Sequence, residues 1–379
     1  MPSARARPLR VAILGTRGIP ANYGGFETFA QELGVRLVAN GHEVTVYGRS
    51  HHVPRGLTTH KGVALTVLPT VRHKYLDTVA HTLLSVLHAL PRRFDIVLLC
   101  NAANALFAGL PRLTGTRVVL NVDGIERLRR KWNVVGQAWY LLSERLATLC
   151  PNAIVTDASS IETYYRERYG ASSTFIPYGA SLERSTRSDT LEALGLEPGR
   201  YFLYVSRLEP ENNADVVIRA FARGRFSRKL AIVGDAPYSR TYIESLKHLA
   251  GPGVVFTGGV YGEGYRQLQT HAGIYVHATE VGGTHPALVE AMGVGNCVIV
   301  NDVPENREVA GNAGVYFDAR DPATLTAALE AVDADASLVA RKGAEATVRA
   351  RENFSWDAVT MQYERLFRHV LGFDEGGRP

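Results

Sequence analysis

Short runs of β-branched and aliphatic residues alternate with segments of helical periodicity along the chain, and this alternation constrains the fold more than any other feature. The first run, residues 9–15, ends in a glycine and leads into a glycine-rich loop. Apolar residues at helical spacing follow, at Phe26, Phe29, Leu33 and Leu37. Strands separated by helices imply right-handed crossovers and a largely parallel sheet. The sequence therefore predicts an α/β fold.

The alternation occurs twice in the 379 residues, and a chain of this length is expected to form two domains. In the first half the strand candidates are residues 9–15, 43–47, 63–67, 94–100, 117–122 and 153–156. In the second half they are residues 201–206, 230–233, 254–257, 273–277, 297–300 and 315–317. We therefore expect two doubly wound, Rossmann-like domains, residues 1–178 and 179–355. A last helix, within residues 356–379, is expected to pack back on the first domain.

Composition excludes several classes of protein. Hydrophobic residues at 46% and charged residues at 21% are ordinary for a globular chain. The apolar stretches fall well short of the roughly 20 residues that a membrane span needs, and the basic start lacks a signal-peptide core, so we expect a cytoplasmic protein. Three widely spaced cysteines without metal-ligand spacing predict neither a disulfide framework nor a zinc site.

The net charge of +5 is divided unevenly along the chain. Residues 1–178 contain 21 Lys and Arg against 11 Asp and Glu, a net +10, whereas the remainder contains 21 against 26, a net −5. A basic half favours an anionic partner, for which nucleic acid and a phosphorylated lipid at a membrane surface are both candidates. A merely solvated basic face is the third interpretation.

Candidate functional residues follow the ends of the predicted strands, because ligands of open α/β sheets bind beyond the carboxyl ends. The loop of residues 15–25 places Gly24 and Gly25 at a helix N-terminus, where free amides would form an anion site that Arg17 reinforces. This is not the Gly-x-Gly-x-x-Gly fingerprint, and a simple tight turn is the alternative.

Asp123 ends another predicted strand in the first half, beside Gly124. A carboxylate there could accept a proton or hold sugar hydroxyls, so Asp123 is the best acid or base candidate of this half. Capping the following helix is its alternative role. The run that includes Arg130, Lys131 and Trp132 could meet a phosphate or line a solvated helix face.

In the second half, Arg207 follows a predicted strand and could form two hydrogen bonds with a phosphate. An ion pair with Glu209 or Glu211 is the alternative.

The densest cluster lies at residues 277–292. Thr284 or His285 can cap a helix that begins at Pro286, which would leave the amides of residues 282–284 facing the ligand. Glu290 falls about one turn inside that helix, where it could take two hydroxyls of a ribose.

These segments together resemble the family 4 retaining glycosyltransferases of the GT-B fold, over essentially the whole chain. Four segments are similar to the bacterial, rhamnosyltransferase-like subgroup of cell-surface polysaccharide assembly. They are Gly15-Thr-Arg-Gly-Ile-Pro-Ala-Asn-Tyr-Gly-Gly-Phe-Glu27, Asp123-Gly with Arg130-Lys-Trp132, Arg207-Leu-Glu-Pro-Glu-Asn-Asn213 and Glu280-Val-Gly-Gly-Thr-His-Pro286. The resemblance implies two facing Rossmann-like domains with a cleft between them.

The resemblance also implies roles for single residues. Glu290 would bind the nucleotide ribose, Arg207 the donor diphosphate, and the backbone near Val260 the base. Neither a metal nor a protein nucleophile is implied, since protein donors neutralise the leaving group and the anomeric configuration is retained. Catalytic roles are expected for Asp123, Arg207 and Glu280; further donor contacts for Arg17, Gly24, Gly25, Asn212, Gly282, Gly283, Thr284 and His285; and acceptor contacts for Asp123, Arg130, Lys131 and Trp132.

Two positions depart from the family pattern. Eight residues before Glu290, where the family usually has a second glutamate, the chain has Gly282, and the nearest carboxylate is Glu280. Five residues after Arg207, the usual lysine is replaced by Asn212. We interpret both as a change in how the donor is held, with Arg17 or another residue compensating.

The leading hypothesis is transfer of a hexose or deoxyhexose, of which rhamnose from dTDP-rhamnose is one example, onto a saccharide or lipid-linked acceptor held by the basic domain. Peripheral contact with the inner face of the membrane fits that domain. A nucleotide-sugar epimerase of the same two-domain plan and a noncatalytic nucleic-acid-binding protein are the alternatives, and salt-sensitive DNA binding would mark the latter.

Overall fold

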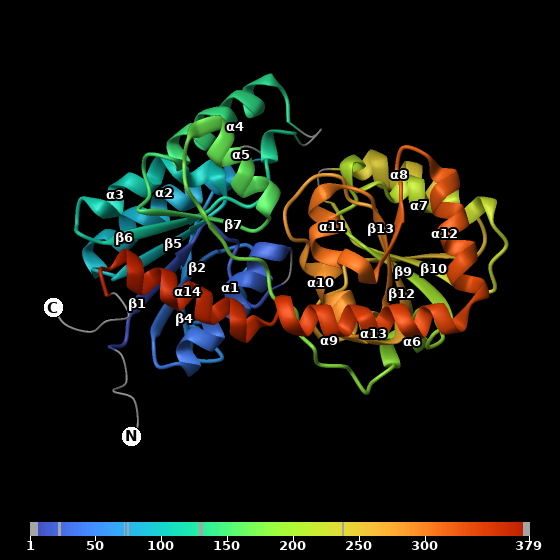
Figure 1. The fold of residues 1–379 in the computed structure, drawn as a ribbon. Helices are drawn as coiled ribbons and strands as arrows, with labels where there is room; N and C mark the ends of the chain where they lie inside the picture. Colours follow the sequence, from blue (N-terminus) through green and yellow to red (C-terminus); the bar gives the residue numbers. More distant parts are fainter. Residues whose placement is uncertain are drawn as a thin grey trace. The chain divides into compact units, whose positions relative to one another are not determined.

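The computed structural model describes residues 7–21, 24–71, 73, 76–128, 132–236 and 239–373. The chain divides into two compact units (Figure 1). Unit 1 comprises the residues up to Arg127, Trp132–Pro177 and the segment from Trp356 onward, and unit 2 comprises Leu128–Lys131 and Tyr178–Ser355. The last helix therefore belongs to the unit that the first residues of the chain build.

Unit 1 is built on a sheet that has eight strands among the described residues, in the order β3-β4-β2-β1-β5-β6-β7-β8. Neighbouring strands are parallel except β3 and β4, which pair antiparallel. The strands are β1 (Arg10–Leu14), β2 (Glu43–Arg49), β3 (Thr59–His60), β4 (Val63–Leu68), β5 (Ile96–Cys100), β6 (Arg117–Asn121), β7 (Ala153–Thr156) and β8 (Thr174–Phe175).

Helices cover both faces of this sheet. On one face α1 packs against α14, and on the other one apolar core joins α2, η2, α4 and α5 to the strands (Figure 1). Short 3₁₀ turns also occur at η1 (Leu90–Arg92) and η3 (Glu126–Leu128). The helices are α1 (Gly25–Ala39), α2 (Asp77–Ala89), η2 (Ala102–Ala108), α3 (Gly109–Arg112), α4 (Val134–Ala147), α5 (Ser159–Tyr169) and α14 (Trp356–Val370).

Unit 2 is built on a sheet with six described strands, all parallel, in the order β11-β10-β9-β12-β13-β14. The strands are β9 (Tyr201–Val205), β10 (Lys229–Val233), β11 (Val254–Gly258), β12 (Gly273–His277), β13 (Cys297–Asn301) and β14 (Gly314–Phe317).

Two apolar cores, one on each face, hold the helices of unit 2 to this sheet. One face carries α7 (Ala214–Arg223), α8 (Arg240–Leu249) and α12 (Pro322–Ala334). The other carries α6 (Asp189–Ala193), α9 (Gly262–Ala272), α10 (Pro286–Gly293), α11 (Pro304–Ala310) and α13 (Ala336–Asn353), and the turns η4 (Pro210–Asn212) and η5 (Gly311–Ala313) complete the unit.

Each sheet contains a point where the strand order reverses. In unit 1 the chain adds β2 and β4 on one side of β1 and then returns to the other side for β5. In unit 2 it adds β10 and β11 on one side of β9 and returns to the other side for β12. Helices that start on either side of such a switch point diverge and leave a crevice at the carboxyl ends of the two strands. The loops after β1, β5, β9 and β12 are therefore the places to look for a site.

The predicted elements are confirmed. Every strand candidate in the sequence corresponds to a strand of the structure, and the expected last helix is α14. Sequence analysis missed β3 and β8, which have only two residues each and too little pattern to detect. In the part of the chain that the structure describes, no helix is long and apolar enough to cross a membrane.

Aromatic packing between α1 and α14 gives the first prediction. The buried ring of Phe29 lies 5.3 Å from that of Tyr363 and 6.4 Å from that of Trp356, between ring centroids. We expect Phe29→Ala to lower the free energy of unfolding by about 3–5 kcal/mol, because a buried ring is lost and a cavity remains. Urea unfolding measures this change. Phe29→Leu, the control, should cost much less, and equal stability of both variants and the wild type would contradict the packing.

Candidate functional site

The loops that follow β9 and β12 are joined by hydrogen bonds at the switch point of unit 2. Asn213 Nδ2 donates to the carbonyl oxygen of Ala278 at 2.8 Å. The backbone N–H of Glu280 donates to the carbonyl oxygen of Glu211 at 3.1 Å. The two loops therefore form one connected edge, and residues on both loops are brought together.

Arg207 lies on the first of these loops, just beyond β9. Its Nη1 atom is 3.9 Å from Glu209 Oε2, and its side chain is 32% exposed. An ion pair that long and that accessible contributes little to the free energy of folding, so a phosphate group could replace Glu209 as the partner of Arg207. Asn212 is buried, and its Nδ2 atom donates to the carbonyl oxygen of Arg207 at 2.6 Å. The residue that stands in place of the usual lysine thus holds the backbone of Arg207.

The second loop leads into the N-terminus of α10. His285 occupies the N-cap position and Pro286 is the first helical residue, as the sequence predicts, although the cap makes no side-chain hydrogen bond. Gly282 has φ +156°, and a Cβ atom there would overlap the ring of His285. A glycine is therefore required at this position. Gly283 and Thr284 are buried within the loop.

Glu290 is fixed by a hydrogen bond from the neighbouring helix α9. The hydroxyl of Tyr265 donates to Glu290 Oε2 at 2.6 Å and accepts from Gln269 Nε2 at 2.9 Å. Burial and the Glu290 carboxylate raise the pKa of Tyr265 well above its usual value, so the hydroxyl stays protonated and the half-buried carboxylate keeps its orientation. Sequence analysis missed Tyr265, because only the packing of α9 on α10 brings it to Glu290.

Val260 lies between β11 and α9, at the same edge of the sheet. It is half-buried, and its Cγ1 atom would lie 3.1 Å from a Cβ atom built at Gly264, so the two residues are in close contact. Val260 thus lies just before α9, the helix that carries Tyr265, and packs against its first turn.

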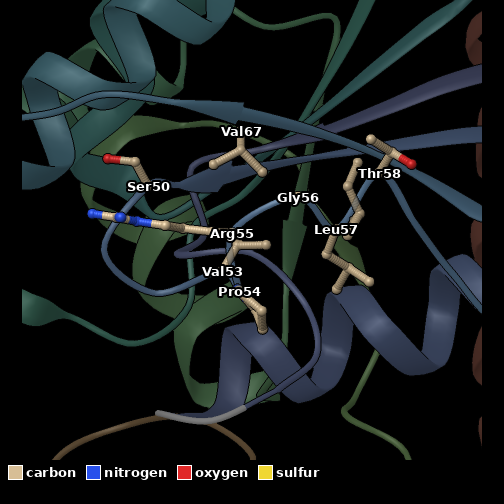
Figure 2. A pocket seen from close by; sticks show the side chains of 9 residues that line it. Ser50, Val53, Pro54, Arg55, Gly56, Leu57, Thr58 and Val67 are labelled. Atoms are coloured by element: carbon tan, nitrogen blue, oxygen red, sulfur yellow. The ribbon is translucent and has the colours of Figure 1, made fainter.

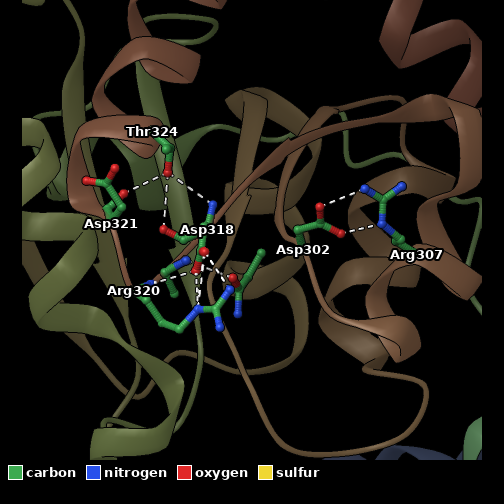
Figure 3. Close-up of polar contacts among 8 residues, drawn as sticks. Asp302, Arg307, Asp318, Arg320, Asp321 and Thr324 are labelled. Atoms are coloured by element: carbon green, nitrogen blue, oxygen red, sulfur yellow. Dashed lines mark hydrogen bonds and ion pairs between the residues drawn. The ribbon is translucent and has the colours of Figure 1, made fainter.

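Arginine–aspartate pairs extend this polar edge to β13 and β14, as Figure 3 shows. Hydrogen bonds from Arg320 lower the pKa of Asp318 to about 2. The pKa of Arg320 is raised by these bonds and, to a smaller extent, by the negative charge of Glu280. The half-buried Glu280 therefore lies in the field of an exposed arginine that sequence analysis did not identify.

The buried His277 packs against the second loop through the ring of His285. His277 ends β12, and its ring lies 4.7 Å from that of His285. Burial lowers the pKa of His277 to about 3, so the ring is neutral at physiological pH. Its Nε2 atom has no hydrogen-bond partner among the described residues.

In unit 1 the glycine-rich loop crosses the switch point between β1 and β5. Gly15 has φ +90°, and a Cβ atom there would overlap the carbonyl oxygen of Cys100 at the end of β5. Glu27, which is buried in the first turn of α1, accepts a hydrogen bond from the backbone N–H of Arg17 at 2.8 Å. This carboxylate, which sequence analysis missed, fixes the loop at Arg17.

Gly24 and Gly25 lie where the prediction places them, at the start of α1. Gly24 is the N-cap, with extended backbone angles, and Gly25 is the first helical residue. Both are half-buried.

Asp123 lies beyond β6, on the other side of β5. Its φ of 58° is in the left-handed region, and its backbone N–H donates to Asn121 Oδ1 at 3.1 Å. Burial raises the pKa of Cys100, and the charges of Glu27 and Asp123 raise it further. The pKa of Cys100, at the end of β5, therefore responds both to Asp123 and to Glu27, the carboxylate that holds the glycine-rich loop.

Trp132 is held by its own unit. Its Nε1 atom donates to the buried Glu126 at 3.2 Å, and its ring lies 5.1 Å from that of Tyr140. The two other residues expected to contact the acceptor, Arg130 and Lys131, lie outside the described residues.

A group of side chains near the same edge of unit 1 has the spacing of metal ligands. Ligand atoms of His51, His52 and Asp77 lie within 4.8 Å of one another. Asp77 accepts a 2.6 Å hydrogen bond from the buried Arg49, and burial and the charge of Arg17 lower the pKa of His52 to about 4. Two nearby guanidinium groups make this group a poor site for a cation.

A pocket of about 500 Å³ lies beside β4, and none of the predicted site residues lines it (Figure 2). It is formed by the loop after β2 and by two side chains of β4. Its lining residues are Ser50, Val53, Pro54, Arg55, Gly56, Leu57, Thr58, Leu65 and Val67.

Two family models match the chain, one in each half. Residues 23–184 match the model described as "Glycosyltransferase Family 4", and residues 199–335 match the model described as "Glycosyl transferases group 1". No curated protein sequence matches significantly.

Solved structures with the same fold span nearly the whole chain. A sucrose-phosphate synthase from Thermosynechococcus elongatus has a TM-score of 0.81 at 18% identity, covering 96% of this chain and 99% of that one. Anabaena HepE in complex with UDP has a TM-score of 0.76 at 16% identity, covering 95% and 100%. A trehalose-phosphate synthase from Burkholderia xenovorans has a TM-score of 0.73 at 11% identity, covering 95% and 100%.

At such low identity these likenesses show the fold, which is GT-B. The two family models, which together match more than half of the chain, indicate a glycosyltransferase with a family 4 region followed by a group 1 region.

The bond between Asn213 and Ala278 yields a prediction for unit 2. Asn213 combines a left-handed backbone, φ 58°, with the side-chain bond that joins the two loops. Asn213→Gly keeps the backbone but loses the bond, and should cost about 1–3 kcal/mol of unfolding free energy, because the buried carbonyl of Ala278 loses a donor. Asn213→Ala should cost more, since it also strains the backbone. Urea unfolding measures both, and a glycine variant as stable as the wild type would contradict the role of the bond.

The buried His277 yields a prediction of pH dependence. Its pKa is about 3 in the folded state against about 6.5 in an unfolded chain, so the unfolded state binds more protons between these values. The stability that His277 contributes is therefore complete above pH 6.5 and falls as the pH is lowered toward 3, by about 1.4 kcal/mol per pH unit in mid-range. In His277→Leu, the free energy of unfolding measured with urea should fall less steeply than in the wild type as the pH is lowered from 6.5 to 5. Equal slopes would mean that His277 is not neutral in the folded protein.

Proposed function

We propose that the chain is a retaining, metal-independent glycosyltransferase that moves a hexose or deoxyhexose from a nucleoside-diphosphate sugar to a saccharide or lipid-linked acceptor. Rhamnose from dTDP-rhamnose is one donor of this class. The observation that carries the proposal is the hydrogen-bonded edge at the switch point of unit 2, which joins the loop of Arg207 to the loop that leads into α10. In this proposal unit 2 holds the donor and unit 1 holds the acceptor.

The chemistry of this edge suits a nucleoside diphosphate. The N-terminus of α10 and the guanidinium of Arg207 both favour the negative charge of a diphosphate. Glu290, fixed by Tyr265, would accept hydrogen bonds from ribose hydroxyls, and the backbone near Val260 would meet the base. Complexes of Anabaena HepE with UDP and with UDP-glucose support a nucleotide-sugar donor for this fold.

The two departures from the family pattern have a physical interpretation here. Asn212 holds the backbone of Arg207 by a 2.6 Å hydrogen bond, so it would position the remaining cation and not replace the missing one. Gly282 leaves room for the ring of His285, and Glu280 would take over the role of the usual first glutamate. Arg17 would supply the second positive charge from unit 1.

Catalysis in this proposal depends on stabilising the leaving group. As the bond between the anomeric carbon and the diphosphate breaks, negative charge grows on the diphosphate, and Arg207 with the α10 amides would stabilise it. Asp123, beyond β6, would orient the acceptor hydroxyl or take its proton. Glu280 would hold the transferred sugar.

Donor binding is tested by thermal shift with UDP, GDP, dTDP and their common sugars, before and after chelation of metals. A nucleotide present at about 100 times its Kd stabilises the native state by about 2.7 kcal/mol, so one nucleotide family should raise the Tm by several degrees with or without chelator. Arg207→Ala and Glu290→Gln should lose most of this shift while their own melting temperatures stay close to that of the wild type.

Arg307→Ala is the matched control, because Arg307 also follows a strand of unit 2 and also pairs with a carboxylate, Asp302 (Figure 3). It should keep the full shift. With the identified donor, turnover should fall at least about a hundredfold in both site variants. Wild-type turnover in both would remove the site assignment, and conversion of the free donor without an acceptor would indicate an epimerase.

A further inference from the structure

Helix α2 of unit 1 carries an apolar stripe on its exposed side. Leu76, Leu83, Leu84 and Leu87 are between 36% and 51% exposed. Their spacing of 7, 8 and 11 residues from Leu76 places them along one side of a helix. The opposite side of α2 is buried in the core of the unit. That buried side includes four polar residues, Asp77, His81, Thr82 and Ser85, beside Val86 and Ala89, so the leucines lie on the side of α2 that its packing against the sheet leaves exposed.

Helix α4 carries a second stripe of the same kind. Val134, Val135, Leu141 and Leu142 are all more than 40% exposed, and Leu149 follows just after the helix. Val134 and Leu141 are seven residues apart, as are Val135 and Leu142, so each pair lies on the same side of the helix.

Both stripes lie over the same face of the sheet. A single core holds α2, η2 and α4 to this face, and η2 contacts both α2 and α4 (Figure 1). Leu106 of η2, the turn that contacts both helices, is itself exposed. We refer to this surface as the α2–α4 face; its residues are Leu76, Leu83, Leu84, Leu87, Leu106, Val134, Val135, Leu141, Leu142 and Leu149.

The exposed charges of the segment that carries the face all have one sign. In residues 76–128 and 132–149, which the structure describes, every exposed charged side chain is an arginine, whereas every carboxylate is buried or half-buried. The arginines are Arg92, Arg93, Arg112, Arg117 and Arg145, and the carboxylates are Asp77, Asp95, Asp123, Glu126 and Glu144.

We propose that the α2–α4 face is a docking surface for an anionic lipid bilayer. Exposed leucines and valines can enter the boundary between headgroups and acyl chains, while arginines at the helix ends meet lipid phosphates. Isolated apolar residues on a surface are ordinary, but ten exposed apolar residues on elements that pack together mark an interaction site. No described helix can span the bilayer, so the contact is peripheral.

The charges of the face select this occupant over two others. A second copy of the chain, related by a twofold axis, would bring the same arginines toward one another. Nucleic acid would use the arginines but would gain little from ten exposed leucines and valines. The membrane assignment stands on the face alone. Its consequence, that the acceptor is lipid-linked, rests on the proposed function.

The test is co-sedimentation of the full chain with vesicles of phosphatidylglycerol and phosphatidylcholine in equal parts, compared with pure phosphatidylcholine. We expect much stronger binding to the anionic vesicles, weakened by salt. Leu84→Glu with Leu87→Glu should reduce the partition coefficient at least about tenfold, because two inserted side chains are lost. Arg93→Gln with Arg145→Gln should reduce it by about 25-fold, since each arginine at the surface contributes about fivefold.

The matched control is Val348→Glu with Met361→Glu. It makes the same charge change at two exposed apolar residues, one on α13 of unit 2 and one on α14, which covers the other face of the unit 1 sheet. This control should bind as the wild type does. Unchanged melting temperatures and an unchanged thermal shift with nucleotide show that each variant is folded and keep this test separate from the donor site.

Four outcomes would overturn the proposal: no binding to anionic vesicles, an equal loss in the control, a dimer that Leu84→Glu with Leu87→Glu dissociates, or salt-sensitive DNA binding without vesicle binding.

Discussion

The hydrogen bonds between the loops after β9 and β12 are the interaction on which the candidate donor site depends. These two strands are parallel neighbours in the sheet, but the chain crosses from β9 to β10 on one side and from β12 to β13 on the other, so no short covalent connection keeps their loops together. Asn213 and the backbone of Glu211 provide that connection, because each bonds the loop after β12. Arg207, the α10 N-terminus and Glu290 then lie on elements that have fixed positions relative to one another. A site built in this way needs few polar groups of its own, since the sheet supplies the rigidity.

Unit 1 meets the same requirement at its switch point by different means. There a glycine, Gly15, allows the loop after β1 to approach the end of β5, and the buried Glu27 holds the loop through the N–H of Arg17. In unit 2 an amide side chain joins the loops, and the glycine at the edge, Gly282, makes room for the ring of His285. The two units therefore share a topology without sharing the residues that stabilise it. This explains why a single sequence motif does not describe both.

The sequence was sufficient to predict the elements of this fold but not the contacts between them. Strands such as β1 and β13 contain short runs of β-branched and aliphatic residues, and Gly or Pro occurs in many of the loops, so these elements can be recognised from neighbouring residues alone. The bond from Tyr265 to Glu290 joins residues 25 positions apart on two helices, and Glu280 and Arg320 follow strands that are separated in the sheet by β13. Such pairs depend on side-chain packing, which spacing does not encode. The position of α10 was predictable because Pro286 limits where a helix can begin.

The membership of α14 in unit 1 has a consequence for how the chain acquires its structure during synthesis. The ring of Phe29 and the amide of Asn121 both find partners on α14, the latter through the hydroxyl of Tyr363. When the ribosome has completed every strand of unit 1, these partners are still about 180 residues from being made. All residues of unit 2 precede α14 in the chain, so unit 2 has all its partners before unit 1 does. Although domains usually mature in the order of their synthesis, here the unit that begins the chain is the last to close its core.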